Sequence, residues 1–156
     1  MRIVLLTLLF VAGIVAVGWT SLPVVTTIRA ADKRSPRTIQ VPADHARIQQ
    51  AIDAAVDGDT VLVAPGIYRE SLQLKGKQIT LASRFLITAD KKDVERTVLD
   101  GKASGKEKGS RGNTPISIAE DVGPKTRIIG FTIANGDDGI SCTAKVQILH
   151  NRFINN

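Results

Sequence analysis

The sequence predicts an all-β domain, a parallel β-solenoid that begins with one amphipathic capping helix. Three observations favour this fold class. A single short stretch, 44–57, carries apolar residues at helical spacing, and from Asp59 onward the apolar period changes to two. Two segments near the end of the chain then repeat at an offset of 20 residues. Repetition at such a period is typical of architectures built by stacking short units.

Residues 1–31 of the 156-residue chain form an apolar N-terminal segment that we interpret as an export signal. Arg2 gives it a positive start, and an unbroken apolar run spans 3–17. Ala16-Val17-Gly18 and Ala30-Ala31 are candidate cleavage sites. An uncleaved membrane anchor is the alternative, because the uncharged stretch 3–28 exceeds the roughly 20 residues that span a bilayer. Both interpretations place the protein in the periplasm, at the cell surface or in the medium, with this segment as its only membrane contact.

The remainder divides into a polar linker, 32–37, and one domain, 38–156. The net charge of the whole chain is +6, and removing Arg2 and Arg29 with the N-terminal segment leaves +4. The excess is scattered and is not interleaved with aromatic residues, so we expect no nucleic-acid partner. Cys142 is the single cysteine, which excludes an intrachain disulfide, and we expect it to be a small buried apolar residue. A reactive thiol is the alternative.

The helical stretch has a narrow apolar stripe and signals at both ends. Asp44 occupies the position of an N-cap, and Gly58 that of a left-handed C-terminal residue. Ile48, Ile52 and Val56 recur on one face. Because the first unit of a stacked β-fold has an exposed apolar end, we expect these three residues to face inward and the helix to cover that end.

Short strand patterns fill the rest of the chain. They occur in "TVLVAPG", "YRESLQL" and "QITLAS", and after a predicted loop, 84–96, in "TVLDG". A Gly/Lys/Ser-rich insertion, 102–113, precedes "PISIAED", "TRIIGFTIANG", "DGISCT" and "KVQILHNRFINN". The strands are short and carry no two-residue Asn-Gly hairpin, which argues against an antiparallel meander.

The internal repeat aligns 127–136 with 147–156. Ile128 falls on Ile148, Ile133 on Phe153 and Asn135 on Asn155, each at an offset of 20. We expect the aligned strands to pair in parallel and their apolar residues to stack. Asn135 and Asn155 would form a ladder at a turn, since asparagine tolerates left-handed backbone and can bond to the neighbouring turn's amides.

The segment "ARIQQAIDAAVDGDTVLVAPGIYRE" resembles the N-terminal cap of the pectin-lyase-like right-handed parallel β-helix superfamily. "LASRFLITADKKDVERTVLDG" and "IIGFTIANG" resemble the segments that follow in its secreted bacterial branch. The resemblance covers 38–156 and implies a right-handed parallel β-helix. In that branch the calcium-binding carboxylates and the catalytic Lys or Arg of the lyases lie on later coils. The resemblance therefore implies a chain truncated at its C-terminus, without the active-site coils and with an uncapped last coil through which it could self-associate.

The function that the resemblance implies is that of the N-terminal part of an exported protein acting on or binding polysaccharide. If the full-length protein is an enzyme, a polysaccharide lyase or glycoside hydrolase is expected. The alternatives are a non-catalytic glycan- or protein-binding module and a truncated product with no independent function. The resemblance specifies the fold far more than the chemistry, because one fold hosts many functions.

Candidate chemistry in the residues themselves is sparse. Asp137 and Asp138 follow a turn and are candidate calcium ligands, although Ca²⁺ needs six to eight oxygens and a solvated turn explains the pair more simply. Lys145 would be a lyase base only with a depressed pKa, and His150 has no visible partner. Tyr68 and Glu70 match the cap motif and are interpreted as structural. No catalytic residue is assigned.

Overall fold

The computed structural model describes residues 34–104 and 113–156. The chain divides into two compact units, Met1–Lys33 and Arg34–Asn156, and all the described strands belong to the second. The predicted signal peptide or anchor therefore lies outside the described residues, as does most of the insertion at 102–113.

Strands dominate the described chain, and all of them are short. Three α-helices accompany them: α1 (Ile48–Ala54), α2 (Phe85–Thr88) and α3 (Lys91–Arg96), with one 3₁₀ helix, η1 (Gly101–Ser104). The first six strands are β1 (Thr38–Val41), β2 (Thr60–Val63), β3 (Gly66–Tyr68), β4 (Leu72–Leu74), β5 (Thr80–Ser83) and β6 (Thr97–Asp100). The others are β7 (Ile116–Ile118), β8 (Arg127–Ile129), β9 (Thr132–Ala134), β10 (Ile140–Cys142), β11 (Gln147–Leu149) and β12 (Arg152–Ile154).

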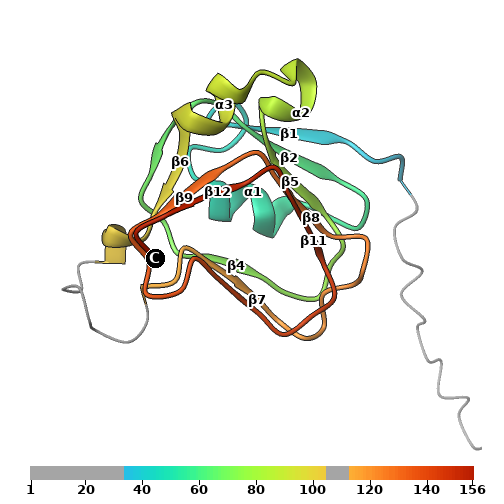
Figure 1. The fold of residues 1–156 in the computed structure, drawn as a ribbon. Coiled ribbons are helices and arrows are strands. Elements are labelled where there is room, and N and C mark those ends of the chain that lie inside the picture. The colour runs from blue at the N-terminus through green and yellow to red at the C-terminus, as the bar shows by residue number, and fades with distance from the viewer. Residues whose placement is uncertain (1–33, 105–112) are drawn as a thin grey trace, which may run out of the picture. The chain divides into compact units, whose positions relative to one another are not determined.

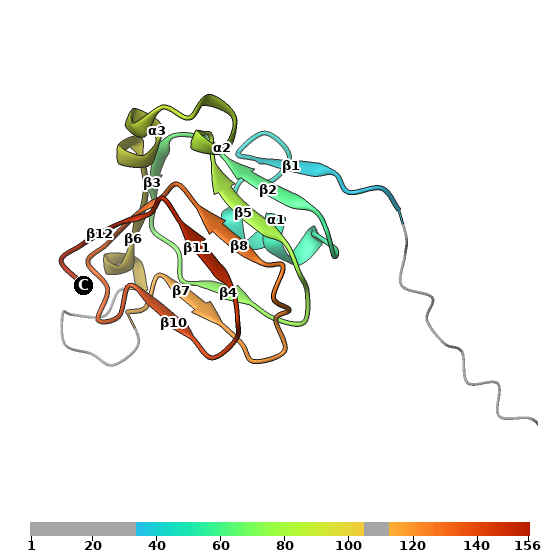
Figure 2. The same cartoon turned by 45° about the vertical axis from the view of Figure 1, so that its right-hand side comes forward.

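The strands form three parallel sheets that the chain visits in turn (Figures 1 and 2). Their orders are β1-β2-β5-β8-β11, β12-β9-β6-β3 and β10-β7-β4. The pairing predicted from the repeat is confirmed, since Ile128 is opposite Ile148 and Ile133 is opposite Phe153 in parallel register.

The predicted fold class is wrong. The structure does not show an all-β parallel β-helix solenoid with a single capping helix. The described residues form a mixed α/β structure, 35% strand and 17% helix, with three parallel sheets and three helices. Two of those helices occupy 84–96, where the sequence analysis predicts a loop.

The helical insertion between β5 and β6 has its own local causes. Asp90 caps α3, because its Oδ1 accepts a hydrogen bond from Lys92 N at 2.9 Å. Arg96 lies in the last turn of α3, where a cation interacts favourably with the helix dipole. Val94 is the buried residue of α3, whereas α2 buries none. These two helices pack on the outside of the sheets, beside β5, β6 and β9 (Figure 1).

One apolar core fills the space enclosed by the three sheets. Strand residues of alternate position supply most of it, because side chains of a strand point to opposite faces. The largest fully buried side chains are Phe131, Ile48, Ile52, Leu72, Leu74, Ile79, Leu81, Leu99, Ile116, Ile128, Ile133 and Val41. Helix α1 closes one end of this core and contacts β1, β2 and β4 (Figure 1).

A buried carboxylate fastens the segment before β1 to the domain. Asp59 is fully buried and accepts hydrogen bonds from Arg37 N (3.0 Å), Val56 N (3.0 Å) and Arg34 Nη2 (2.8 Å). Arg37 Nε lies 3.4 Å from the same carboxylate. Burial opposes ionisation of Asp59, but these hydrogen bonds and the Arg34 charge together lower its pKa below the usual value. Residues Arg34 and Arg37 of the predicted linker are thus held against the domain.

Candidate functional site

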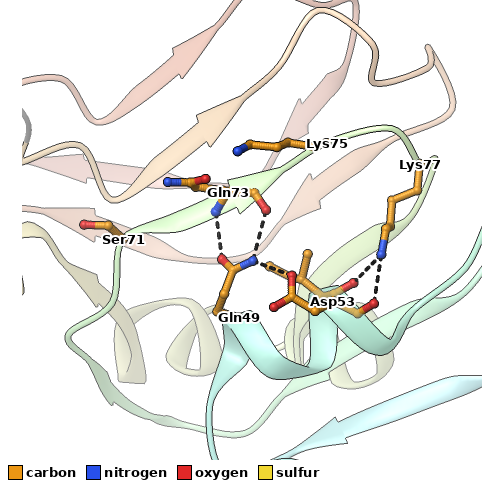
Figure 3. Close-up of a pocket in the computed structure, with 7 residues that line it drawn as sticks. Gln49, Asp53, Ser71, Gln73, Lys75 and Lys77 are labelled. Carbon is orange, nitrogen blue, oxygen red and sulfur yellow. Dashed lines mark hydrogen bonds between the residues drawn. The ribbon is translucent and has the colours of Figure 1, made fainter.

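A polar groove lies between helix α1 and strand β4 (Figure 3). Its volume is about 370 Å³, and we call it the α1–β4 groove. It is lined by Gln49, Ile52, Asp53, Ser71, Gln73, Lys75 and Lys77. Six of these seven residues are polar or charged, so the groove is a site for hydrogen bonds and charge, not for an apolar ligand.

Strand alternation explains why β4 presents polar side chains to the groove. Leu72 and Leu74 are fully buried in the core, and residues on either side of them in sequence point the opposite way. Ser71, Gln73 and Lys75 are exposed and share the outward face. Three chemically different groups therefore line one edge of the groove at a spacing of two residues.

Gln49 of α1 closes the edge of β4 with its side-chain amide. Gln73 N donates to Gln49 Oε1 at 2.8 Å, and Gln49 Nε2 donates to Gln73 O at 3.2 Å (Figure 3). Strand β4 is an edge strand of its sheet, so these backbone groups have no strand partner on this side. The Gln49 amide supplies both bonds that a neighbouring strand would supply, and it also donates to Asp53 Oδ1 at 2.8 Å.

Lys77 caps the C-terminal end of α1 from outside the helix. Its Nζ donates to the carbonyl oxygens of Ile52 (3.0 Å), Asp53 (3.0 Å) and Ala55 (2.9 Å). The last carbonyls of a helix have no partner within it, and a cation there also offsets the negative end of the helix dipole. All three N–H donors of the ammonium group are used in this way.

Glu70 caps the other end of the same helix. Ile48 N and Gln49 N donate to its two carboxylate oxygens, both at 3.2 Å, and Arg47 Nε lies 3.6 Å from Oε2. The predicted N-cap Asp44 is wrong, because its carboxylate accepts from Gln40 N at 2.7 Å instead. The cap is supplied by a residue 22 positions along the chain from Ile48.

Tyr68 supports the turn that brings Glu70 to the helix. Its hydroxyl donates to Ala64 O at 2.8 Å. Burial, and secondarily the Glu70 charge, raises the pKa of Tyr68. Both residues thus have structural contacts in the turn and helix cap.

The uncommitted groups of the α1–β4 groove differ from these structural ones. Within 34–104 and 113–156, Ser71 Oγ, the Gln73 side-chain amide and Lys75 Nζ have no hydrogen bond or ion pair. The second carboxylate oxygen of Asp53 is also unoccupied there. A hydroxyl, an amide, an ammonium and a carboxylate oxygen together can recognise a ligand that carries hydroxyl groups and an anionic group.

The candidate calcium ligands Asp137 and Asp138 lie in an exposed turn after β9. Asn113 N donates to Asp137 Oδ2 at 3.4 Å, and Asp137 N donates to Asn113 O at 3.1 Å. No cluster of three or more His, Cys, Asp or Glu residues that could hold a metal occurs in the described ranges. Among residues 34–104 and 113–156, the pair thus belongs to no such cluster.

The three residues expected to cover the end of the core, Ile48, Ile52 and Val56, differ in their burial. Ile48 and Ile52 are buried in the core, at 0% and 1% exposure. Val56 is partly exposed and lies beyond the helix, which ends at Ala54. Gly58 has φ +88° but lies in the turn after the helix and does not cap it.

Asn135 and Asn155 occupy matching turns with left-handed backbone, at φ +58° and +54°. Asn135 Nδ2 donates to Asp100 Oδ1 at 2.8 Å. The bonds to neighbouring backbone amides come from other asparagines: Phe131 N donates to Asn151 Oδ1 and Gly136 N donates to Asn156 Oδ1. Sequence reasoning missed these two, although both are asparagines in the last 20-residue repeat.

Cys142 is exposed, so the expectation of a buried residue is wrong. It lies on β10, an edge strand, and its Sγ donates to Ala144 O at 3.1 Å. Lys145 is also exposed. Neither residue lines the α1–β4 groove.

Comparisons with known proteins leave the family open. No family model, curated protein or solved structure matches the chain. The resemblance to the pectin-lyase-like superfamily and the extracytoplasmic location therefore stay predictions. No helix within the described ranges is long and apolar enough to cross a membrane.

Proposed function

We propose that the protein binds an acidic polysaccharide in the α1–β4 groove without turning it over. The observation that carries the proposal is that the uncommitted side chains Ser71, Gln73 and Lys75 line the same groove as Asp53. A uronate unit offers one carboxylate and several hydroxyls, which is the pattern these four groups can pair. The net charge of +6 favours encounter with such a polyanion.

Each uncommitted group has a definite role in this proposal. Lys75 pairs with the carboxylate of a uronate unit, because its ammonium is the uncommitted cation of the groove. Asp53 and the Gln73 amide accept hydrogen bonds from sugar hydroxyls, and Ser71 donates or accepts. The groove is open and lacks aromatic side chains, so hydrogen bonds and charge supply the affinity.

The hydrogen bonds of Lys77 favour binding over turnover in this groove. A lysine acts as a general base only as the neutral amine, which has two N–H donors. Lys77 Nζ donates to the carbonyls of Ile52, Asp53 and Ala55, so this nitrogen is occupied by the helix end. The groove contains no histidine or cysteine. Lys77 thus holds the C-terminal end of helix α1.

The test compares binding of polygalacturonate and of neutral dextran to the full chain. The Lys75→Gln variant removes the charge and should weaken polygalacturonate binding about threefold to fivefold, as expected for loss of one exposed ion pair. The matched control is Lys92→Gln, which removes the same charge from exposed helix α3. Raising NaCl from about 0.02 M to about 0.5 M should remove the difference, because the added salt screens exposed charges.

Three outcomes would contradict the proposal. Equal affinity of the Lys75→Gln and Lys92→Gln variants would show that net charge, and not the groove, determines binding. Equal binding of dextran would remove the acidic specificity. A growing absorbance from unsaturated sugar product during incubation with the full chain would show turnover.

A further inference from the structure

We propose that a second pocket, between the helical insertion and the β11–β12 turn, binds a small hydroxylated aromatic carboxylate. The pocket has a volume of about 270 Å³ and is lined by Phe85, Lys91, Val94, Glu95, His150, Asn151 and Arg152. It lies on a different part of the domain from the α1–β4 groove and shares no lining residue with it. The inference is independent of the proposed polysaccharide binding.

The floor and one wall of this pocket are apolar and aromatic. Val94 is buried at 8% exposure, and the Phe85 ring is partly exposed beside it. The His150 ring lies 5.1 Å from the Phe85 ring, centroid to centroid, at an interplanar angle of 47°. Aromatic rings prefer such offset or tilted packing, and a third flat ring can extend it. A planar ligand is therefore favoured over a branched aliphatic one.

The backbone at His150 lies in the left-handed region. His150 has φ +54°, and Gly130, one repeat earlier, has φ +79°. The pairing of Ile129 with Leu149 makes these two residues equivalent positions after matching strands. Glycine adopts this backbone without strain, whereas an L-residue does not. The turn thus carries a histidine where glycine is the unstrained residue, and strain of this kind concentrates at ligand sites.

The rim of the pocket carries charges that the protein does not neutralise. Lys91, Glu95 and Arg152 line it, and their side chains make no hydrogen bond or ion pair within the described parts of the chain. Two cations and one carboxylate leave an excess positive charge, which selects an anionic ligand. A ligand carboxylate pairs with Arg152 and Lys91, and Glu95 accepts from a ligand hydroxyl.

The turn that presents His150 and Arg152 is held by Asn151. Its Nδ2 donates to Ile128 O at 2.8 Å, and its Oδ1 accepts from Phe131 N at 2.8 Å. Asn151 therefore positions the turn, and these bonds use one of its two amide N–H donors. The ligand-contacting groups are the two rings and the three charges.

The size of the pocket limits the ligand to one ring with substituents. An apolar cavity of roughly 150 Å³ accommodates benzene, and the 270 Å³ of this pocket leaves room for a carboxylate and a hydroxyl. A fragment of this size in an open pocket should bind with a dissociation constant of about 0.1–1 mM. 4-Hydroxybenzoate is the simplest probe of the class.

Equilibrium dialysis of 4-hydroxybenzoate against the full chain tests the proposal. The neutral analogue 4-hydroxybenzyl alcohol and the non-aromatic cyclohexanecarboxylate should each bind at least about fivefold more weakly, because each lacks one recognised feature. Lys91→Gln and Arg152→Gln should weaken binding about threefold to tenfold. The neighbouring Lys92→Gln, which does not line the pocket, is the matched control.

His150→Gly separates a binding role from a structural one. Glycine accepts the positive φ of this turn, so the thermal midpoint of the variant should stay the same or rise. Binding of 4-hydroxybenzoate should nevertheless fall about fivefold, because the stacking ring is lost. The proposal is overturned if wild type shows no binding up to about 10 mM probe, or if Lys91→Gln and Lys92→Gln bind equally. Unchanged affinity of His150→Gly would also overturn it.

Discussion

Replacing Asp59 with asparagine should destabilise the domain more than any other single change of charge among its described carboxylates. The carboxylate accepts from Arg34 Nη2, Arg37 N and Val56 N, with Arg37 Nε at 3.4 Å. In the Asp59→Asn variant an amide NH₂ replaces one acceptor oxygen. A donor then faces donors in a fully buried position.

The size of the effect follows from burial and from the exposure of the partners. Removing one partner of a buried ion pair costs about 3–5 kcal/mol. The Arg34 and Arg37 side chains are 30% and 48% exposed, so water replaces part of what they lose. We expect the lower end, about 3 kcal/mol, which corresponds to roughly 12 °C in the midpoint of a domain of this size.

The pH dependence of Asp59 supplies a second signature. The pKa of its carboxyl in the folded protein lies below its usual value of 3.8. A group of this kind stabilises the fold above its unfolded pKa, and that stability is lost as pH falls through the folded pKa. The difference in stability between wild type and Asp59→Asn should be full at about pH 7 and shrink below about pH 4.

Chemical denaturation of the full chain, followed by circular dichroism, measures both signatures. Asp121→Asn is the control, because Asp121 is exposed and has no hydrogen bond or ion pair within the described ranges. If Asp59→Asn lies within about 0.5 kcal/mol of this control, the buried carboxylate does not hold the segment before β1. A difference that does not change between about pH 7 and pH 3 would refute the electrostatic part of the reasoning.

Two further predictions concern the helix cap and the core. Glu70→Gln should lower stability by about 1 kcal/mol, since Ile48 N and Gln49 N lose a charged acceptor. Thermal melting measures this loss, with the exposed Glu120→Gln variant as the control. Equal midpoints of the two variants would exclude capping by Glu70. Leu99→Ala should lower stability by about 2–5 kcal/mol because Leu99 is fully buried. Ile67 lies on an adjacent strand of the same sheet but is 67% exposed, so Ile67→Ala should change the stability by less than about 0.5 kcal/mol. Similar losses of stability in the Leu99→Ala and Ile67→Ala variants would contradict the placement of the core.

The strand pairing was readable from the sequence because it repeats. Ile128 and Ile133 each recur 20 residues later, and both pairs are opposite one another in the structure. Periodicity reports which residues share a face, and an equal offset reports which strands are adjacent. The same pattern says nothing of exposure at the last layer, where Phe153 is 50% exposed.

The two helices of the insertion were not readable from periodicity, and the predicted fold class was wrong for that reason. Helix α2 has four residues and buries none, with Leu86 and Ile87 exposed at 45% and 71%. A helix of one turn leaves no amphipathic period to detect. The available signal was Asp90 before Asp93 and Arg96, a cap and end charges in the right order.

The groove depends on contacts that span the chain. Asp44 has the right type and place for an N-cap, yet Glu70 caps the helix from 22 residues away. Lys77 binds carbonyls 22 to 25 residues before it. Local sequence patterns report local bonds, so a side chain that returns to an earlier helix is visible only once the strands between them are placed.

The amide of Gln49 makes the two edges of the sheet β10-β7-β4 different from each other. At Gln73 the backbone groups of β4 are occupied by a side chain that imitates a strand, whereas β10 at the opposite margin has no such cover among the described residues. An extended peptide arriving from outside can add to this sheet only beside β10 unless α1 first detaches. Helix α1 thus prevents a further strand from pairing with β4. Without this helix, both edge strands of the sheet, β4 and β10, would be open to pairing with an added strand.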